Sequence, residues 1–167
     1  MEVLPILWDI RSTHNVGAIL RSAACFGIPM AWCVGITPYP RQDNDQRLPH
    51  ISERAHREIA KTALGAETMV TTTHFPADLS LISTLQADGY TVAALEQWPT
   101  SQSLDSFKHS QPDRLAIIFG NEPQGLPKEV VAACDMCIEI PQAGQKESLN
   151  VSVAAGIALY TLTVINS

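Results

Sequence analysis

The stretch from Ile138 to Tyr160 constrains the fold most, because it changes character twice within a few residues. Residues 138–140 alternate like the end of a strand, and Pro141 ends that strand because proline cannot donate to a sheet ladder. A polar loop follows at 142–147, and apolar residues then recur on two faces of a predicted helix at 149–164. A helix that is apolar nearly all round is typical of a buried position, and this one is shorter than the roughly twenty residues that span a bilayer.

Ser148 and Asn150 stand where this polar loop meets the helix N-terminus, a place with free amides and a positive dipole end. A structural interpretation makes Ser148 the N-cap and Asn150 a first-turn residue. A chemical interpretation holds a hydroxyl and an amide rigidly beside a ligand-binding loop. The residues of the other polar loops are needed to choose between the structural and the chemical interpretation.

Strand and helix patterns alternate along the chain. Strands are predicted at 3–10, 30–36, 67–73, 90–95, 114–119 and 136–140. Helices are predicted at 18–26, 53–64, 77–88, 128–133 and 149–164, with long polar loops at 37–52 and 97–113. This alternation predicts an α/β fold with a mainly parallel sheet and helices on both faces. Such sheets bind ligands at the carboxyl ends of their strands.

The 167 residues, 46% of them hydrophobic, fit a single domain with one core at 1–167. The N-terminus carries Glu2 and Asp9 and no early basic region, so no signal peptide is expected and a cytoplasmic location is favoured. Cys134 and Cys137 have C-x-x-C spacing, but no second pair supports zinc and the motif leads into a strand instead of opening a helix. No metal site is predicted.

The net charge of −6 has the wrong sign for a protein that attracts nucleic acid globally. The basic residues are nevertheless uneven, because seven fall in about the first third of the chain: Arg11, Arg21, Arg41, Arg47, Arg54, Arg57 and Lys61. An acidic protein can still present a local basic face.

Three polar loops follow predicted strands. The first carries Asn15, with Arg21 on the helix beyond it. The second, after residue 119, begins Gly120-Asn-Glu, where glycine lets a ligand approach the backbone, and the third is the loop before the last helix. The second loop lacks the Gly-Lys-Ser/Thr ending of a P-loop, and the chain has no G-x-G-x-x-G. A standard dinucleotide fold is therefore not expected.

The three loops contain segments that together resemble a known family. These are NVGAILRSAACFG at 15–27, FGNEPQGL at 119–126 and IPQAGQKESLNVSVAA at 140–155. In order and spacing they resemble the three motifs of the SpoU (TrmH-like) RNA ribose methyltransferases of the SPOUT superfamily. The resemblance covers essentially the whole chain.

The resemblance implies a deep trefoil knot, formed as the C-terminal segment threads under the loop before it, which is a rare exception to normal chain topology. It implies that S-adenosylmethionine lies bent in the knot, so a side chain added at position 120 is expected to enter the cofactor space. It also implies a homodimer packed through C-terminal helices. The implied cofactor-binding positions are Leu95, Glu96, Gly120, Glu122, Ile140 and Leu149.

The implied reaction moves a methyl group to a ribose 2′-hydroxyl of RNA. Arg21 is expected to act on that hydroxyl, with four catalytic neighbours: Asn15, Glu122, Ser148 and Asn150. Arginine keeps its proton at pH 7, so we expect Arg21 to fix the adjacent phosphate and steady the alkoxide instead of acting as a simple base. The structural alternatives are a surface ion pair for Arg21 and a helix-capping carboxylate for Glu122.

The expected partner is RNA, most of all tRNA, with ribosomal RNA as the alternative. No appended RNA-binding domain is expected, so the core itself must contact RNA, through candidates Arg11, His14, Arg41, Arg47, Arg54 and Arg57. Acidic residues are interleaved there, so a solvated face is an equal alternative. A catalytically inactive, knotted RNA-binding or assembly factor is a second hypothesis, which the full polar set disfavours. A small-molecule methyltransferase is a third, and the arginine cluster speaks against it.

Overall fold

A computed structural model describes residues 1–109, 112–121 and 124–165. Its strands form one seven-stranded sheet in the order β3-β2-β1-β6-β4-β7-β5, and every strand pairing in these residues is parallel. The strands are β1 Glu2–Trp8, β2 Met30–Val34, β3 Thr71–Phe75, β4 Thr91–Leu95, β5 Gln102–Ser103, β6 Arg114–Phe119 and β7 Met136–Glu139. The predicted α/β class with a parallel sheet is confirmed.

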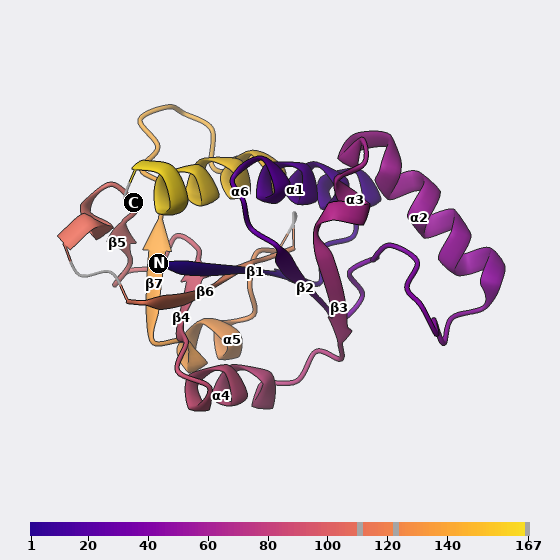
Figure 1. The fold of residues 1–167 in the computed structure, drawn as a ribbon. Coiled ribbons are helices and arrows are strands. Elements are labelled where there is room, and N and C mark those ends of the chain that lie inside the picture. Colours follow the sequence, from indigo (N-terminus) through magenta and orange to yellow (C-terminus); the bar gives the residue numbers. More distant parts are fainter. Residues whose placement is uncertain (110–111, 122–123, 166–167) are drawn as a thin grey trace.

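Helices cover both faces of the sheet (Figure 1). They are α1 Thr13–Cys25, α2 Pro49–Ala63, α3 Ala66–Met69, α4 Ser80–Ala87, α5 Lys128–Ala133 and α6 Val151–Tyr160. A 3₁₀-helical turn lies at Ser106–His109, and α6 continues as a π-helical turn at Thr161–Ile165. One layer holds α1, α2, α3 and α6, and the other holds α4 and α5. Over the described ranges, every helix is too short or too polar to cross a membrane.

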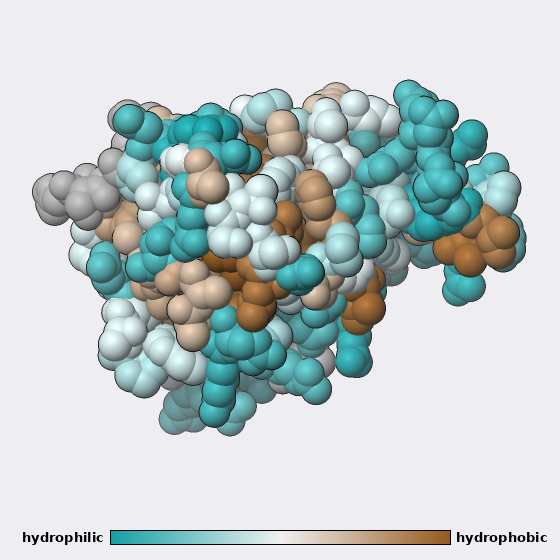
Figure 2. All heavy atoms as spheres, turned by 90° about the horizontal axis from the view of Figure 1, so that it is seen from below, coloured by the Kyte–Doolittle hydropathy of each residue, from teal (hydrophilic) through white to brown (hydrophobic). Residues whose placement is uncertain are grey.

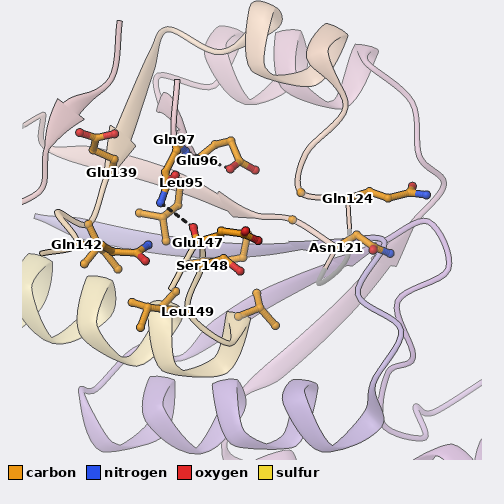
Figure 3. A pocket seen from close by; sticks show the side chains of 16 residues that line it. Leu95, Glu96, Gln97, Asn121, Gln124, Glu139, Gln142, Glu147, Ser148 and Leu149 are labelled. Atoms are coloured by element: carbon orange, nitrogen blue, oxygen red, sulfur yellow. Dashed lines mark hydrogen bonds between the residues drawn. The ribbon is translucent and has the colours of Figure 1, made fainter. Parts of the chain in front are cut away.

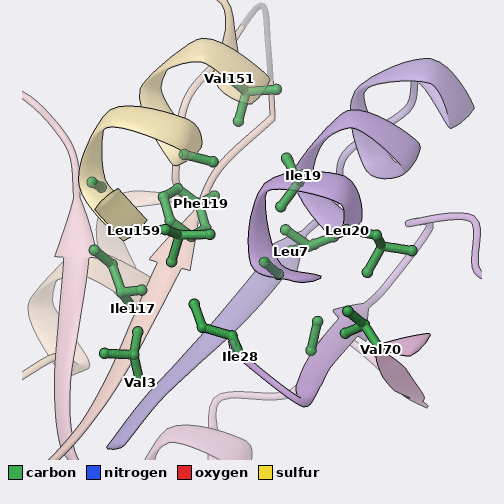
Figure 4. Packing of buried hydrophobic residues seen from close by; sticks show 14 of the residues in the cluster. Val3, Leu7, Ile19, Leu20, Ile28, Val70, Ile117, Phe119, Val151 and Leu159 are labelled. Atoms are coloured by element: carbon green, nitrogen blue, oxygen red, sulfur yellow. The ribbon is translucent and has the colours of Figure 1, made fainter. Parts of the chain in front are cut away.

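Alternation along the strands divides the core into two clusters. Leu7, Ile117 and Phe119 point toward α1 and α6, where they meet Leu20 and Leu159 (Figure 4). The neighbouring strand positions, such as Ile6 and Ile118, pack on the α4 and α5 side. Because both faces are buried, the central strands are almost continuously apolar, as parallel strands usually are.

Two predicted boundaries differ from the structure in the second quarter of the chain. Helix α2 starts at Pro49 and not at residue 53, because proline at the first helical position has no amide to leave unpaired. The strand predicted at 67–73 begins instead with the helical turn α3, and β3 starts only at Thr71. Gly65, with φ +98°, sets up that turn, and its amide donates to Glu67 Oε2 at 2.9 Å.

Two further differences concern strand β1 and the 97–113 loop. β1 ends at Trp8, because Asp9 has a φ of +53°, which turns the chain out of the sheet. Asp9 Oδ1 then accepts from the Ile36 amide at 3.0 Å, so the turn is fixed to the end of β2. The predicted loop at 97–113 contains β5, which pairs with β7 at the sheet edge.

Candidate functional site

A cavity of about 280 Å³ lies at the carboxyl ends of β4, β6 and β7, next to the start of α6 (Figure 3). This is the edge at which parallel sheets bind ligands. Its walls come from the segments 95–97, 119–121, 124–125, 139–142 and 147–154. Among the described residues, these walls are Leu95, Glu96, Gln97, Phe119, Gly120, Asn121, Gln124, Gly125, Glu139, Ile140, Gln142, Glu147, Ser148, Leu149, Val151 and Ala154.

Five of the six positions expected to bind the cofactor line this one cavity: Leu95, Glu96, Gly120, Ile140 and Leu149. Ser148, expected to be catalytic, lines it as well. The sixth position, Glu122, lies outside the residues that the structure describes. Segments more than fifty residues apart in sequence therefore meet at one site.

The carboxylate of Glu96 organises the loop after β6. Its Oε2 accepts from the Leu126 amide and its Oε1 from the Gln97 amide, both at 3.0 Å. A Cβ on Gly125 would stand 2.4 Å from Glu96 Oε2, and Gly125 has a φ of +67°, so only glycine suits that position. Both Glu96 oxygens thus have backbone partners within the protein, and the side chain acts by fixing the cavity wall.

Gly120 lines the cavity, and a side chain added there would first meet the loop that forms part of its wall. A Cβ built on Gly120 would stand 2.7 Å from the Leu126 nitrogen and 2.8 Å from the Gly125 carbonyl carbon. The glycine is needed because the loop folds back onto its own start. The expectation that a larger side chain would enter the cofactor space stays a prediction, and the close contact with this loop is a separate reason why such a substitution should be harmful.

Two polar loops are joined across the cavity by Gln97. Its Nε2 donates to the Glu147 carbonyl oxygen at 3.3 Å (Figure 3). Sequence reasoning missed Gln97 and Glu147 as lining residues. The available signal was position, since Gln97 comes two residues after β4 ends and Glu147 precedes Ser148.

Asn121 is a second lining residue that sequence reasoning did not select, although it directly follows Gly120. It is 9% exposed, and its Nδ2 donates to the Asp9 carbonyl oxygen at 2.7 Å. Its Oδ1 is buried without a hydrogen-bond partner among the described residues. Asn121 therefore ties the loop after β6 to the turn after β1, which leads into α1.

Asn150 is the N-cap of α6. Its Oδ1 accepts from the Ser152 amide at 2.8 Å and from the Ser152 hydroxyl at 2.6 Å. The helix thus begins at Val151 instead of residue 149, and the cap is Asn150 instead of Ser148. Ser148 is exposed at the cavity, and its hydroxyl has no hydrogen-bond partner within residues 1–109, 112–121 and 124–165.

Asn15 and Arg21 lie on α1 and do not line the cavity. The Asn15 amide donates to the Ser12 N-cap hydroxyl at 3.2 Å. Arg21 is exposed, and its guanidinium has no hydrogen-bond or ion-pair partner in the described part of the chain. Helix α1 packs against α6, and a Cβ on Gly156 would stand 3.6 Å from Ser22 Oγ.

Arg47, one of the candidate RNA contacts, is engaged inside the 37–52 loop. Its guanidinium donates to both Asp45 carboxylate oxygens and to the carbonyl oxygens of Tyr39 and Pro40. It also lies 3.5 Å from the centroid of the Tyr39 ring, and its side chain is only 18% exposed. These bonds hold the pKa of Asp45 well below its usual range. Arg47 therefore shapes the loop and is not available to a phosphate.

In the C-x-x-C pair, Cys134 is half-buried and Cys137 is buried. Burial raises the pKa of the Cys134 thiol to about 12, and burial also raises the pKa of Cys137. The Cys134 thiol donates to the Val130 carbonyl oxygen at 3.2 Å, and the Cys137 thiol donates to the Glu96 carbonyl oxygen at 3.3 Å. Within the described ranges, no group of three or more His, Cys, Asp or Glu side chains is placed to hold a metal ion.

Two relatives found by comparison with known proteins are RNA 2′-O-methyltransferases. The chain is 33% identical over 165 residues to the 23S rRNA (guanosine-2′-O-)-methyltransferase RlmB of Coxiella burnetii, covering 95% of the chain and 56% of that protein. It is 26% identical to the tRNA (guanosine(18)-2′-O)-methyltransferase of Borreliella burgdorferi, covering 94% of the chain and 64% of that protein.

A solved structure matches the whole fold. The AdoMet-bound rRNA methyltransferase from Sinorhizobium meliloti superposes with a TM-score of 0.75 at 24% identity, over 96% of this chain and 55% of that one. The chain spans less than two thirds of the length of these relatives. The model of the SpoU rRNA methylase family matches residues 2–160, and the chain therefore belongs to that family.

Proposed function

We propose that residues 1–167 form a methyltransferase domain that transfers a methyl group from S-adenosylmethionine to a ribose 2′-hydroxyl of RNA. One observation carries the proposal: the loops of the second and third motifs and the end of β4 line a single cavity at the carboxyl edge of a parallel sheet. Family membership and the fold shared with an AdoMet-bound relative support the same function.

The lining residues fit the cofactor. Leu95, Ile140, Leu149 and Val151 offer apolar walls, while Gly120 leaves its stretch of backbone without a side chain. This combination of apolar walls with a few polar groups suits a small organic ligand. When bound, S-adenosylmethionine supplies an electrophilic methyl group on a sulfonium. The chain's part is to hold the loops at fixed spacing, through the bonds that Glu96 accepts and the one that Gln97 donates.

Arg21 is our candidate for the residue that acts on the acceptor hydroxyl. A ribose hydroxyl is a poor nucleophile at neutral pH, so the site must position it and stabilise the negative charge that develops on oxygen. The exposed guanidinium of Arg21 suits a bidentate contact with the neighbouring phosphate. Because arginine keeps its proton at pH 7, the phosphate or a water receives the hydroxyl proton.

The other four proposed catalytic residues take different parts. Ser148 offers a hydroxyl at the cavity wall, and Asn150 fixes the start of α6 beside it by capping that helix. Asn15 belongs to the first turn of the helix that carries Arg21. Glu122 is assigned from its place in the motif alone.

We further propose a homodimer that packs through α6 and its π-helical extension. Four apolar side chains recur there at helical spacing and are 39–49% exposed: Val153, Ile157, Tyr160 and Val164. A contiguous exposed apolar stripe of this kind usually marks an interface. Because α1 packs against α6, Arg21 would lie near such an interface, which accounts for its distance from the cavity of its own chain.

A knotted C-terminal segment is also part of the proposal. In the sheet, β7 lies between β4 and β5, both of which precede it in sequence. The loop after β7 is bonded back to the loop after β4 through Gln97. This order supports a chain that passes through an earlier loop instead of adding at a sheet edge.

The substrate to test first is tRNA, and ribosomal RNA is the second candidate because the Coxiella burnetii relative is a 23S rRNA methyltransferase. Nucleoside mass spectrometry of both RNA pools, from cells with and without this protein, tests the proposal. Loss of one ribose-methylated nucleoside from one pool is the expected result. No loss in either pool, combined with retained RNA binding, would favour an inactive RNA-binding or assembly factor.

Arg21→Ala tests the assignment of the acceptor residue. Methyl transfer should fall by orders of magnitude, while S-adenosylmethionine affinity and thermal stability should stay at the wild-type values because Arg21 is exposed and unpaired in the described ranges. Lys128→Ala, at an exposed position on α5, is the matched control and should keep full activity. Full activity in Arg21→Ala would remove that residue from the mechanism.

A further inference from the structure

We infer that the outward face of α2 is a contact surface for RNA phosphates; this rests on the proposed function. Four basic residues recur on α2 at intervals of four, three and four: His50, Arg54, Arg57 and Lys61. This spacing places them on one side of a helix, and all four are exposed. We call them the basic stripe.

The basic stripe faces away from the protein. The buried residues of α2 are Ser52, Ile59 and Ala63, which lie on the opposite side of the helix. At 1.5 Å per residue the basic stripe is about 16 Å long. A nucleic-acid duplex carries about one backbone charge per 1.7 Å of its axis, so this length can face several phosphates.

The two central charges of the basic stripe are available. The guanidinium groups of Arg54 and Arg57 have no hydrogen-bond or ion-pair partner among residues 1–109, 112–121 and 124–165. The acidic residues on the same helix already have basic partners. Lys61 Nζ lies 2.8 Å from Glu58, and Arg41 of the preceding loop lies 3.7 Å from Glu53. The ion pairs of these two carboxylates are therefore with Lys61 and Arg41, and Glu58 acts on Arg57 only as a nearby charge.

The basic stripe leads toward the residues proposed to act on the acceptor. Near its Lys61 end, Thr62 Oγ1 donates to the His14 carbonyl oxygen at 2.8 Å, one residue before Asn15. A Cβ on Gly17 would stand 2.3 Å from the Ile59 carbonyl oxygen, so the backbones of α1 and α2 are in close contact. The helix that bears the stripe is thus fixed rigidly to the helix that bears Asn15 and Arg21.

The shape of the molecule suits a long, charged partner. Helix α2 projects from the end of the helical layer (Figure 1), and in the view from below, hydrophilic side chains cover much of the projecting arm (Figure 2). The same view shows an apolar patch near the tip of the arm (Figure 2). Leu48 and Ile51, at the start of α2, are exposed. In a protein of net charge −6, a local basic face on an exposed helix fits a phosphate backbone better than a neutral surface.

The test compares Arg54→Gln/Arg57→Gln with wild type and with Lys128→Gln, a control on the other face of the sheet. The probe is a fluorescein-labelled, unmodified tRNA transcript, titrated by fluorescence anisotropy at several salt concentrations. Phosphate contacts do not depend on sequence, so this probe is valid whichever RNA is the substrate. Calorimetric titration with S-adenosylmethionine and a melting curve are recorded for each protein.

The double variant should bind the probe at least tenfold more weakly at low salt. Its plot of log affinity against log salt should be less steep by about 1.4–1.8, since each lost phosphate contact removes about 0.7–0.9. Lys128→Gln should match wild type, and S-adenosylmethionine affinity should be equal in all three. Arg54→Lys/Arg57→Lys keeps the charges and should retain most of the wild-type salt dependence.

Three results would overturn the inference, and they separate it from the proposed function. Unchanged tRNA affinity and salt dependence in the glutamine variant, with methyl transfer intact, would reject this surface alone. Loss of tRNA binding in the lysine variant would show that charge is not what α2 contributes. Failure of the wild-type protein to bind tRNA, at any salt concentration, would reject this surface, while the nucleoside analysis of both RNA pools would still decide the proposed function.

Discussion

Replacing Gly120 by alanine tests the close approach of residue 120 to residues 125 and 126 at the cavity wall. The alanine Cβ would stand 2.7 Å from the Leu126 nitrogen and 2.8 Å from both the Gly125 carbonyl carbon and Leu126 Cγ. Two of these three atoms are backbone atoms, so no side-chain rotation can relieve the contact. The backbone at residues 125 and 126 must therefore move away from residue 120.

The expected loss of folding stability follows from the contacts that this movement breaks. Forcing an extra carbon into a packed site costs about 1–3 kcal/mol. The displaced Leu126 amide would also weaken its 3.0 Å bond to the Glu96 carboxylate, and a hydrogen bond to a charged group contributes about 1.5–3 kcal/mol. The two effects overlap, so we expect a loss of about 2–4 kcal/mol. For a domain of this size the Tm should fall by roughly 5–15 °C.

The assay is thermal and urea unfolding together with calorimetric titration of S-adenosylmethionine. Gly144→Ala is the matched control, because a Cβ there meets nothing within 4 Å. Its stability should be within about 1 kcal/mol of wild type or slightly higher, since alanine restricts the unfolded chain. Cofactor affinity should fall in Gly120→Ala and change little in Gly144→Ala.

A Gly120→Ala protein with wild-type Tm and weakened cofactor binding would refute this reasoning. It would mean that the side chain enters the cavity and leaves the loop in place, as the sequence alone suggested. An unchanged Tm together with unchanged affinity would mean that the close approach of residues 120 and 126 does not exist in solution.

Three further perturbations have defined outcomes. Arg47 lowers the pKa of Asp45 in the folded state, so this ion pair stabilises the fold above the ordinary pKa of 3.8 and the stabilisation is lost as pH falls below it. Urea unfolding between pH 7 and pH 2 should show a smaller acid loss in Asp45→Asn. Asn121→Ala removes the bond to Asp9 and should cost about 1–3 kcal/mol by the same assay, whereas a loss below 0.5 kcal/mol would contradict a structural tie. Iodoacetamide at pH 7 should modify exposed Cys25 before the other three cysteines, as mass spectrometry of intact protein will show.

The fold could be predicted well because its signals are local and strong. Strand β6 and helix α5 were predicted at their observed bounds, since each is an apolar or amphipathic run between clear loop residues. Errors fell where backbone geometry decides the boundary. The positive φ of Asp9 ends β1 before the predicted residue 10, and the turn that begins at Gly65 replaces the start of the strand predicted at 67–73.

The site divides into a part that the sequence predicts and a part that it does not. The family resemblance implied Leu95, Gly120 and Ile140 as cofactor positions, and the structure brings them together because the carboxyl ends of neighbouring parallel strands lie at one edge of the sheet. What each side chain does could not be predicted. The close approach of position 120 to Leu126 depends on the tertiary fold, and the spacing of residues in the sequence does not predict it.

Helix α6 shows why hydrophobicity alone leaves an ambiguity. A helix apolar on two faces was predicted to be buried, and one face is: Ala155, Ala158 and Leu159 have no exposed surface. The other face, with Val153 and Ile157, stays exposed in the single chain. Burial in the chain's own core and burial against a second copy both favour apolar residues. The sequence pattern therefore does not distinguish a core helix from a dimer interface. The exposed stripe is therefore the feature that the proposed homodimer explains and a monomeric core does not.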